Sequence, residues 1–286
     1  ISLIDIIYNI MDIQLIALDL DRTTLNSQGK LSKANYNALS QAIKNGVHVC
    51  IASGRAFDTL PSDVLSVPGI EYAITSNGAA VYNIKTKERI KSYLLTENAI
   101  DIIMNICKKY PVTYEAFING VAYTGKEYID NPYKFGATQH SIDYVLSTRT
   151  LKDDIVGFIY ENKNRLDCID IIVNNDELKN TIINEIKTAT NEVYITSSIK
   201  QLIEISYKDA GKKSGLEFLS NYLNISRENI AAFGDADNDF DMIKYAGVGI
   251  AMENASSHLL EVADYTTLHH DNNGVAYAFK NIINVC

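Results

Sequence analysis

The apolar residues of this chain fall into two alternating kinds of segment. Short runs rich in β-branched residues predict strands at residues 13–18, 47–52, 72–75, 230–233 and 248–251. Longer stretches with helical spacing predict helices at residues 33–44, 214–222 and 240–245. Strands that alternate with helices in this way predict an α/β fold with a parallel sheet flanked by helices. Ligands of such sheets collect beyond the carboxyl ends of the strands, so the polar clusters at those ends are candidate sites.

The middle third of the chain follows a different pattern. A hairpin is expected over residues 112–123, because Asn119-Gly120 is a favoured two-residue turn. Helices are expected at residues 97–109 and 176–188, and strands at residues 156–160, 168–173, 193–196 and 202–206. We therefore expect an α+β cap domain at residues 86–200, inserted into a core made of residues 11–85 and 201–286.

Residues 1–10 are apolar but lack a basic leading segment and a small-residue cleavage site. Acidic and amide side chains interrupt the stretch, so it predicts neither a signal peptide nor a membrane span. The first methionine is Met11, directly before the first expected strand. We interpret residues 1–10 as an amino-terminal extension.

Charge and cysteine content limit the partners and the compartment. The chain has 26 Lys and Arg against 35 Asp and Glu, a formal net charge of -9, and no basic stripe that could neutralise a nucleic-acid backbone. Nucleic acid is therefore not an expected partner. The four cysteines are scattered without a Cys-x-x-Cys pair, which predicts neither a zinc site nor a disulfide framework. A reducing cytoplasm is the simplest setting.

Two carboxylates follow the first expected strand. Because side chains alternate along a strand, Asp19 and Asp21 are expected to leave the sheet on the same side and converge. Converging carboxylates repel each other unless a cation lies between them or one keeps a proton, and both arrangements suit chemistry on a phosphate. An aspartate pair at this point could also form only a turn or a helix cap.

Two further motifs could bind an anion. Ser53 and Gly54 follow the second expected strand, where a hydroxyl and free backbone N–H groups could face a phosphate oxygen. Lys212 precedes the helix expected from residue 214, although the helix dipole favours anions at that end, and a bound anion would explain the lysine. Taken singly, the first motif also fits a plain turn and the second a surface lysine.

The fourth motif is acidic. Residues 234–241, Gly-Asp-Ala-Asp-Asn-Asp-Phe-Asp, follow the expected strand at 230–233 and suggest a site for a hard cation. A calcium loop of the EF-hand type does not fit, because counting from Asp235 places Phe240 at the required glycine and Ala246 at the required glutamate. The remaining alternative is a solvated acidic turn that caps the next helix.

In this order and at these places, the four motifs resemble those of the haloacid dehalogenase superfamily of phosphohydrolases. The large insert between the second and third motifs resembles the Cof-type branch, which implies a Rossmann-like core with an α/β cap. Further matches are Ser76-Asn77-Gly78-Ala79 and Met252-Glu253-Asn254-Ala255. The resemblance runs from about Met11 to the carboxyl end, through motifs in the core and through architecture alone in the cap.

The resemblance implies a role for each matching residue. Asp19 would be the nucleophile and Asp21 the general acid and base. Asp235 would bind Mg²⁺ together with Asp19 and the backbone carbonyl of Asp21, with Asp239 in the outer shell of the metal. The phosphate would be held by Ser53, Gly54, Lys212 and Asn238. Lys212 is preferred to Lys213 because the two lysines of the family's Lys-Gly-x-x-Lys pattern fall at Lys208 and Lys212, with Asp209 at the glycine position.

This chain departs from the family pattern at three positions. Arg22 stands where glycine is usual, Thr24 where leucine is common, and Glu253 where glycine often precedes Asn254. None of these changes removes a reacting group, so we expect altered access or specificity and retained activity.

The expected activity is Mg²⁺-dependent hydrolysis of a small phosphorylated metabolite through an aspartyl phosphate. The alternatives are a sugar phosphomutase of the same superfamily and a protein that binds a phosphorylated metabolite without turnover. Release of free phosphate without a bisphosphate activator would distinguish a phosphatase from a mutase. Turnover of a phosphate ester would distinguish it from a binding protein.

Overall fold

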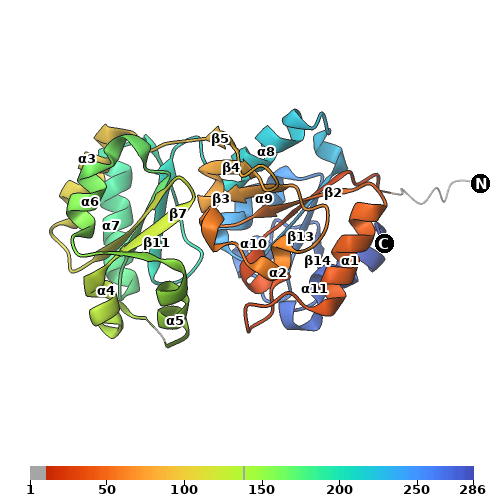
Figure 1. Ribbon diagram of the computed structural model, residues 1–286, viewed down its shortest axis with the longest axis horizontal. Helices are drawn as coiled ribbons and strands as arrows, with labels where there is room; N and C mark the ends of the chain where they lie inside the picture. Colours follow the sequence, from red (N-terminus) through yellow and green to blue (C-terminus); the bar gives the residue numbers. More distant parts are fainter. Residues whose placement is uncertain (1–10, 138) are drawn as a thin grey trace, which may run out of the picture.

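The computed structural model describes residues 11–137 and 139–286, and its strands form two sheets (Figure 1). The eight-stranded sheet, which with its helices we call the core, has the order β14-β13-β12-β1-β2-β3-β4-β5. Its strands are β1 (Leu15–Leu18), β2 (His48–Ala52), β3 (Tyr72–Thr75), β4 (Ala80–Asn83), β5 (Arg89–Ser92), β12 (Ile230–Gly234), β13 (Val248–Ala251) and β14 (Tyr265–Thr266). The strands from β14 across to β3 run parallel, and β4 and β5 continue antiparallel.

Helices cover both faces of the core sheet, because the buried side chains of each strand alternate between two apolar clusters. Ile16 and Leu18 pack with Leu39 and Phe279, whereas Leu15 and Ala17 pack on the opposite face. The helices of the first face are α1 (Lys33–Lys44), α2 (Ser62–Leu65) and α11 (Gly274–Asn281). Those of the second face are α8 (Lys212–Tyr222), α9 (Phe240–Tyr245) and α10 (Ser257–Leu260). The expected Rossmann-like core is confirmed.

The six-stranded sheet, which with its helices we call the cap, occupies the left half of Figure 1 and has the order β10-β11-β9-β6-β7-β8. Its strands are β6 (Thr113–Ile118), β7 (Val121–Gly125), β8 (Thr150–Lys152), β9 (Cys168–Ile172), β10 (Val193–Thr196) and β11 (Leu202–Tyr207). One face packs against α3 (Glu97–Cys107), α6 (Ile155–Glu161) and α7 (Asp176–Ala189), and the far end of the other face against α4 (Lys126–Asp130) and α5 (Gln139–Thr148). This is the α+β insert that the sequence predicts.

The strand expected at residues 156–160 is wrong, since these residues lie in α6. The β-branched and aromatic residues of this segment favour a strand locally. However, Asp154 caps a helix by accepting a hydrogen bond from the backbone N–H of Gly157, and the buried residues Ile155 and Ile159 have the spacing of one helix face.

The points at which the chain passes from one sheet to the other lie a few residues away from the expected domain boundaries. β5 belongs to the core sheet although it follows residue 86, and β11 belongs to the cap sheet although it follows residue 201. The division of the chain into separate folding domains stays a prediction. The extension expected at residues 1–10 lies outside the described residues.

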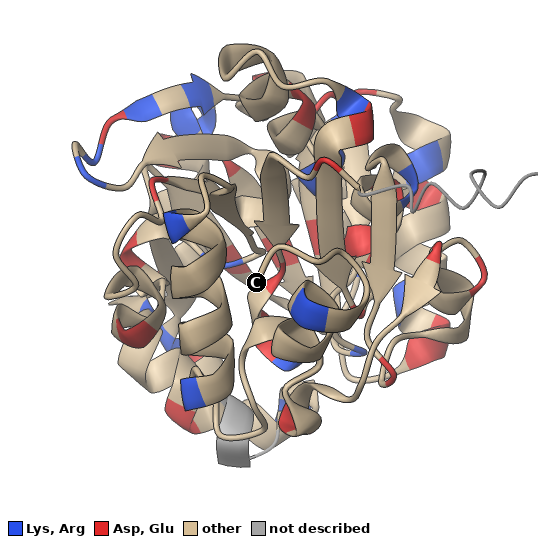
Figure 2. Ribbon diagram, turned by 90° about the vertical axis from the view of Figure 1, so that its right-hand side faces the viewer, with Lys and Arg blue, Asp and Glu red and all other residues tan. Residues whose placement is uncertain are grey.

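The distribution of charge and the length of the helices concern the expectations about nucleic acid and about membranes. In the end view of the core, basic and acidic residues are interspersed over the elements (Figure 2). Among the described residues, no helix combines the length and the apolar character that a membrane crossing needs.

Candidate active site

Two loops meet where the strand order of the core reverses. The chain runs outward from β1 to β2 and β3, and later outward in the other direction from β12 to β13 and β14. β1 and β12 pair directly, with Leu18 opposite Phe233. Asp19 directly follows β1 and Asp235 directly follows β12, so both lie at the carboxyl edge of the sheet at this switch point. Open α/β sheets bind their ligands at this place.

Lys212 links the two loops from the first position of α8. Its Nζ lies 2.7 Å from Asp19 Oδ1 and 2.6 Å from Asp239 Oδ1, and its side chain is fully buried. Asp239 Oδ2 accepts hydrogen bonds from the backbone N–H groups of Asp235 (2.9 Å) and Ala236 (3.1 Å). Asp239 therefore fixes both the ammonium group and the loop that carries Asp235.

Gly234 makes this close approach possible. A Cβ at this position would lie 2.4 Å from Cβ of Asp239, closer than two side-chain carbons can come. The glycine before Asp235 in the fourth motif therefore has a steric role, and the motif folds as a tight loop around the carboxylate of Asp239. Asn238 in the same loop donates a hydrogen bond from Nδ2 to Asn77 Oδ1 at 3.0 Å.

The site contains more negative than positive charge. Carboxylate oxygens of Asp19, Asp235 and Asp239 lie within 4.8 Å of one another, all three residues are buried, and Lys212 is the ammonium group among them. Burial and the neighbouring carboxylate of Asp239 raise the pKa of Asp235 to about 7. Burial likewise raises the pKa of Asp19 well above its ordinary value, against the attraction of Lys212.

This donor set fits a hard divalent cation. It consists of oxygen atoms, which Mg²⁺ prefers, and burial together with the neighbouring carboxylates raises the pKa of Asp19 and of Asp235. Burial opposes the charge of Lys212, yet Asp19 and Asp239 outweigh this effect and raise the pKa of the lysine. The lysine therefore stays charged and compensates part of the negative charge, and a divalent ion would compensate the rest.

Asp21 does not join the carboxylate cluster, contrary to the expectation that it converges with Asp19. β1 ends at Leu18, and Asp21 lies in the irregular turn Leu20–Thr24, where strand alternation no longer applies. Its two oxygens accept hydrogen bonds from Arg55 Nε (2.8 Å) and Nη2 (2.6 Å). The guanidinium group of Arg55 also stacks on the ring of Tyr144 in the cap, 4.9 Å from the ring centroid.

The expected phosphate-binding residues lie on neighbouring elements. β1 and β2 pair Leu18 with Ile51, so Ser53 follows β2 at the same edge as Asp19. Ser53 is buried, and its Oγ accepts a hydrogen bond from the backbone N–H of Arg55 at 3.2 Å. Sequence reasoning gave no role to Arg55 or to the side chain of Asn77, although both lie within or beside motifs that it singled out.

A family model of haloacid dehalogenase-like hydrolases matches residues 16–279. The chain belongs to this family. Phosphatase YwpJ of Bacillus subtilis is 29% identical over 94% of this chain and 100% of that relative. The 5-amino-6-(5-phospho-D-ribitylamino)uracil phosphatase YcsE of the same bacterium is 29% identical over 95% of this chain and 96% of the relative.

A solved haloacid dehalogenase-like hydrolase from B. subtilis superposes with a TM-score of 0.82 at 28% identity and covers 94% of this chain and 100% of its own. The agreement extends over the core and the cap together. The protein is thus a phosphatase of the Cof-type branch, as the four motifs and the large insert between the second and third of them indicate.

Arg22, which stands where the family usually has glycine after the aspartate pair, lies at the edge of the site. Arg22 adopts a left-handed conformation (φ 61°), which explains why glycine suits this position. Its side chain is 62% exposed, and its Nε lies 3.8 Å from Asp235 Oδ2. The backbone carbonyl of Arg22 accepts a hydrogen bond from Asn254 Nδ2 at 2.9 Å.

We expect Arg22→Gly to leave the turnover number nearly unchanged. Glycine keeps the backbone conformation, and an exposed ion pair contributes only about 0–1 kcal/mol. Measurement of kcat and KM separates the possible roles, since a substrate contact by Arg22 would raise KM while leaving kcat in place. A collapse of kcat would contradict the position of Arg22 outside the reacting groups.

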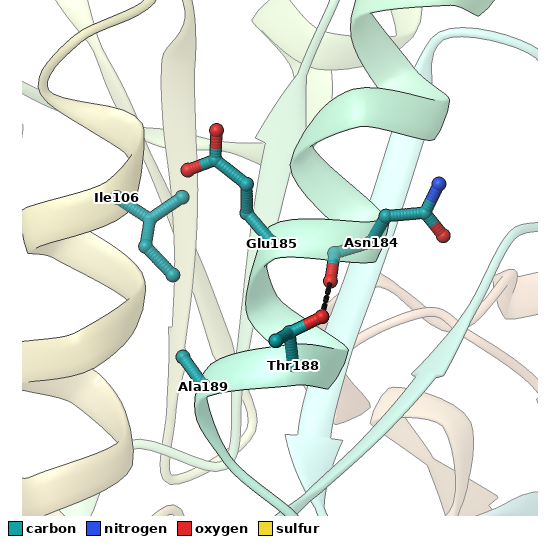
Figure 3. A pocket seen from close by; sticks show the side chains of 5 residues that line it. All are labelled: Ile106, Asn184, Glu185, Thr188 and Ala189. Carbon is teal, nitrogen blue, oxygen red and sulfur yellow. Dashed lines mark hydrogen bonds between the residues drawn. The ribbon is translucent and has the colours of Figure 1, made fainter.

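A depression elsewhere on the hydrolase lies between α3 and α7 (Figure 3). It is lined by Ile106, Asn184, Glu185, Thr188 and Ala189. Glu185 is already paired with Lys109 and Tyr110, and Thr188 donates to the backbone carbonyl of Asn184. The depression lies on the helical face of the cap and holds none of the motif residues, so it is not a candidate for the chemistry.

Proposed function

We propose that this enzyme hydrolyses small phosphomonoesters with Mg²⁺ and that Asp19 is the covalent nucleophile. The observation that supports this most strongly is the buried lysine shared by Asp19 and Asp239 beside Asp235, at the switch point of the sheet. A carboxylate that attacks a phosphate ester needs compensation of negative charge, and this cluster is built around that need. The names of the relatives, which are phosphatases, agree with the proposal.

Asp19 and Asp235, with the backbone carbonyl of Asp21, would hold the Mg²⁺ ion, and Asp239 would support them from the outer shell. The bound ion would supply positive charge for the phosphoryl oxygens in the transition state. Ser53, the backbone N–H of Gly54, Lys212 and Asn238 would bind and orient the phosphate group.

The reaction then runs in two displacements. An oxygen of Asp19 attacks phosphorus, the bond to the leaving oxygen breaks, and Asp21 protonates that oxygen. Asp21 next takes a proton from a water molecule, which attacks the phosphorus of the aspartyl phosphate and releases inorganic phosphate from Asp19. Because Arg55 holds both oxygens of Asp21 in this structure, the mechanism requires that substrate binding loosens this pair.

We expect the best substrates to be sugar phosphates or phosphorylated cofactors of similar size. The cap lies over the carboxyl edge of the core, where a closed site leaves little room for a polymer. The test compares Mg²⁺-dependent kcat/KM on hexose and pentose phosphates, pyridoxal phosphate and flavin mononucleotide with that on a phosphopeptide and a phosphorylated oligonucleotide. A polymer as the best substrate would overturn the size argument. Movement of the phosphate between positions of a sugar that depends on a bisphosphate activator, without release of free phosphate, would favour a mutase.

Mg²⁺ is expected to raise the melting temperature of the wild type, and to do so more strongly as the pH rises through about 7. The raised pKa of Asp235 means that the metal-free protein holds a proton there and loses stability as the pH rises through that value, whereas the metal binds the ionised form. Asp235→Asn should remove most of the Mg²⁺ effect. An equal Mg²⁺ shift in this variant and the wild type would exclude Asp235 as a ligand.

A further inference from the structure

Three carboxylates form a row across the middle of the cap sheet. The strand register places Glu115 of β6 directly opposite Asp170 of β9, and Asp170 directly opposite Glu204 of β11. All three residues are at most 4% exposed. We call Glu115, Asp170 and Glu204 the acid row.

The acid row lies on the sheet face that meets the core. Phe117 and Cys168 lie two residues along their strands from Glu115 and Asp170 and therefore on the same face, where they pack against Ala56 of the core loop that follows β2. Glu204 Oε1 accepts a hydrogen bond from Asn77 Nδ2 at 2.9 Å and would lie 3.2 Å from a Cβ built on Gly54.

Contacts tie both ends of the acid row to the catalytic loops. At one end, Glu204 is bonded to Asn77, which in turn accepts from Asn238. At the other end, Arg149 pairs with Glu115 at 2.8 Å and stacks on Tyr144. Arg55, which holds Asp21, also stacks on this ring. The row therefore faces the proposed phosphate and acid–base residues and lies on the side from which a leaving group would extend.

The fold alone gives no reason for this row. Like charges directly opposite each other in a sheet are destabilising, and burial of carboxylates adds to the cost. Arg149 partners Glu115, and Asn77 with the backbone N–H of Ser198 partners Glu204. Asp170, in the centre, accepts only from the thiol of Cys168 at 3.1 Å, and no other hydrogen bond of the described residues reaches it.

Burial and the neighbours Glu204 and Glu115 raise the pKa of Asp170 well above its ordinary value. In its neutral form the side chain offers one O–H donor as well as acceptor oxygens, which is the pattern that complements a hydroxyl group. The flanking carboxylates add further acceptors. Arg149 pairs with Glu115 and Lys179 attracts Glu204, but the groups that form the row itself are carboxyls, which repel an anion held against them.

We propose that the acid row, with Asp170 at its centre, binds the leaving group of the substrate and selects an uncharged chain or ring that carries several hydroxyl groups. This inference rests on the proposed function and specifies its substrate class. Hydroxyl donors satisfy the buried acceptors, whereas a second phosphate or a carboxylate on the leaving group is repelled. The acid row is thus a specificity determinant, distinct from the residues that bind the transferred phosphate.

The test compares Asp170→Val with the wild type on a hexose monophosphate, a pentitol phosphate and p-nitrophenyl phosphate, whose leaving group has no hydroxyl substituent. We expect kcat/KM to fall about tenfold to a hundredfold on the two polyhydroxylated substrates and to stay within about threefold on p-nitrophenyl phosphate. Asp170→Asn, which keeps a donor and an acceptor, should retain most of the preference. Wild-type activity on phosphoglycerate, whose leaving group carries a carboxylate, should be at least about tenfold below that on the hexose phosphate.

Thr113→Val is the matched control, because Thr113 is buried on the same face of β6, one row away from the acid row. It should leave the ratio between substrates unchanged. Equal losses on all three substrates in Asp170→Val, or no loss on any, would overturn the inference while leaving the phosphatase proposal intact. A wild type that releases phosphate from none of these esters would overturn the proposed function and the inference with it.

Discussion

Asp19→Asn is expected to abolish phosphate release while the fold stays intact. The amide is nearly isosteric but is a poor nucleophile, so we expect kcat to fall by at least about a hundredfold. The change also removes one of three crowded carboxylates, and Asp239 remains to partner Lys212. The metal-free variant should therefore melt at the wild-type temperature or above it.

The measurement is phosphate release under saturating substrate, together with thermal melting in the presence of a chelator. Asn238→Asp is not a suitable control, because it adds a charge to the same cluster. Arg22→Gly is suitable, since it changes the same loop outside the reacting groups. A residual rate in Asp19→Asn above about a hundredth of the wild type would remove Asp19 from the nucleophile role.

Lys212→Met is expected to impair both stability and catalysis. The substitution leaves Asp19 and Asp239 buried without their shared cation, and loss of one partner from a buried ion pair typically costs about 3–5 kcal/mol of unfolding free energy. Catalysis should fall by about a hundredfold to a thousandfold, because the ammonium group also compensates the phosphoryl charge.

The double variant Lys212→Met with Asp239→Asn separates the two effects. It removes a carboxylate along with the lysine, so urea denaturation without metal should show a smaller loss of unfolding free energy than in Lys212→Met alone. Its activity should remain as low as that of the single variant. Recovery of activity along with stability would mean that Lys212 has only a structural role.

The core could be predicted closely from the sequence because its signals are local. The helices expected at residues 33–44 and 240–245 and the strand at 248–251 coincide with α1, α9 and β13. In the cap, the strand predicted at residues 156–160 was wrong. Local residue preference there favours a strand, whereas the helix cap at Asp154 and the packing of the segment favour a helix. Spacing also could not reveal that α8 begins at Lys212, two residues earlier than expected.

The site could be predicted as a set of motifs but not as a network of contacts. Four site residues stand at strand ends or helix starts in the sequence, and this position predicts that they lie close together. The structure brings them together: Asp19, Lys212, Asp235 and Asp239. The Asp21–Arg55 pair was missed because a turn, not a strand, carries Asp21. The acid row was missed because it depends on the register of three strands that are far apart in sequence.

The central claim is that phosphate is carried covalently by Asp19. The most direct measurement is an acid quench of the enzyme during turnover of a radiolabelled phosphomonoester with Mg²⁺, followed by borohydride reduction and mass spectrometry of the peptides. On a phosphomonoester whose leaving group departs without protonation, such as p-nitrophenyl phosphate, Asp21→Asn should accumulate the labelled enzyme, because it keeps the nucleophile but lacks the group that activates water for the second displacement. The account predicts that reduction converts Asp19 to homoserine in the wild type and to a greater extent in Asp21→Asn. Label on another residue, or an enzyme that turns over without any label at Asp19 in either protein, would contradict it.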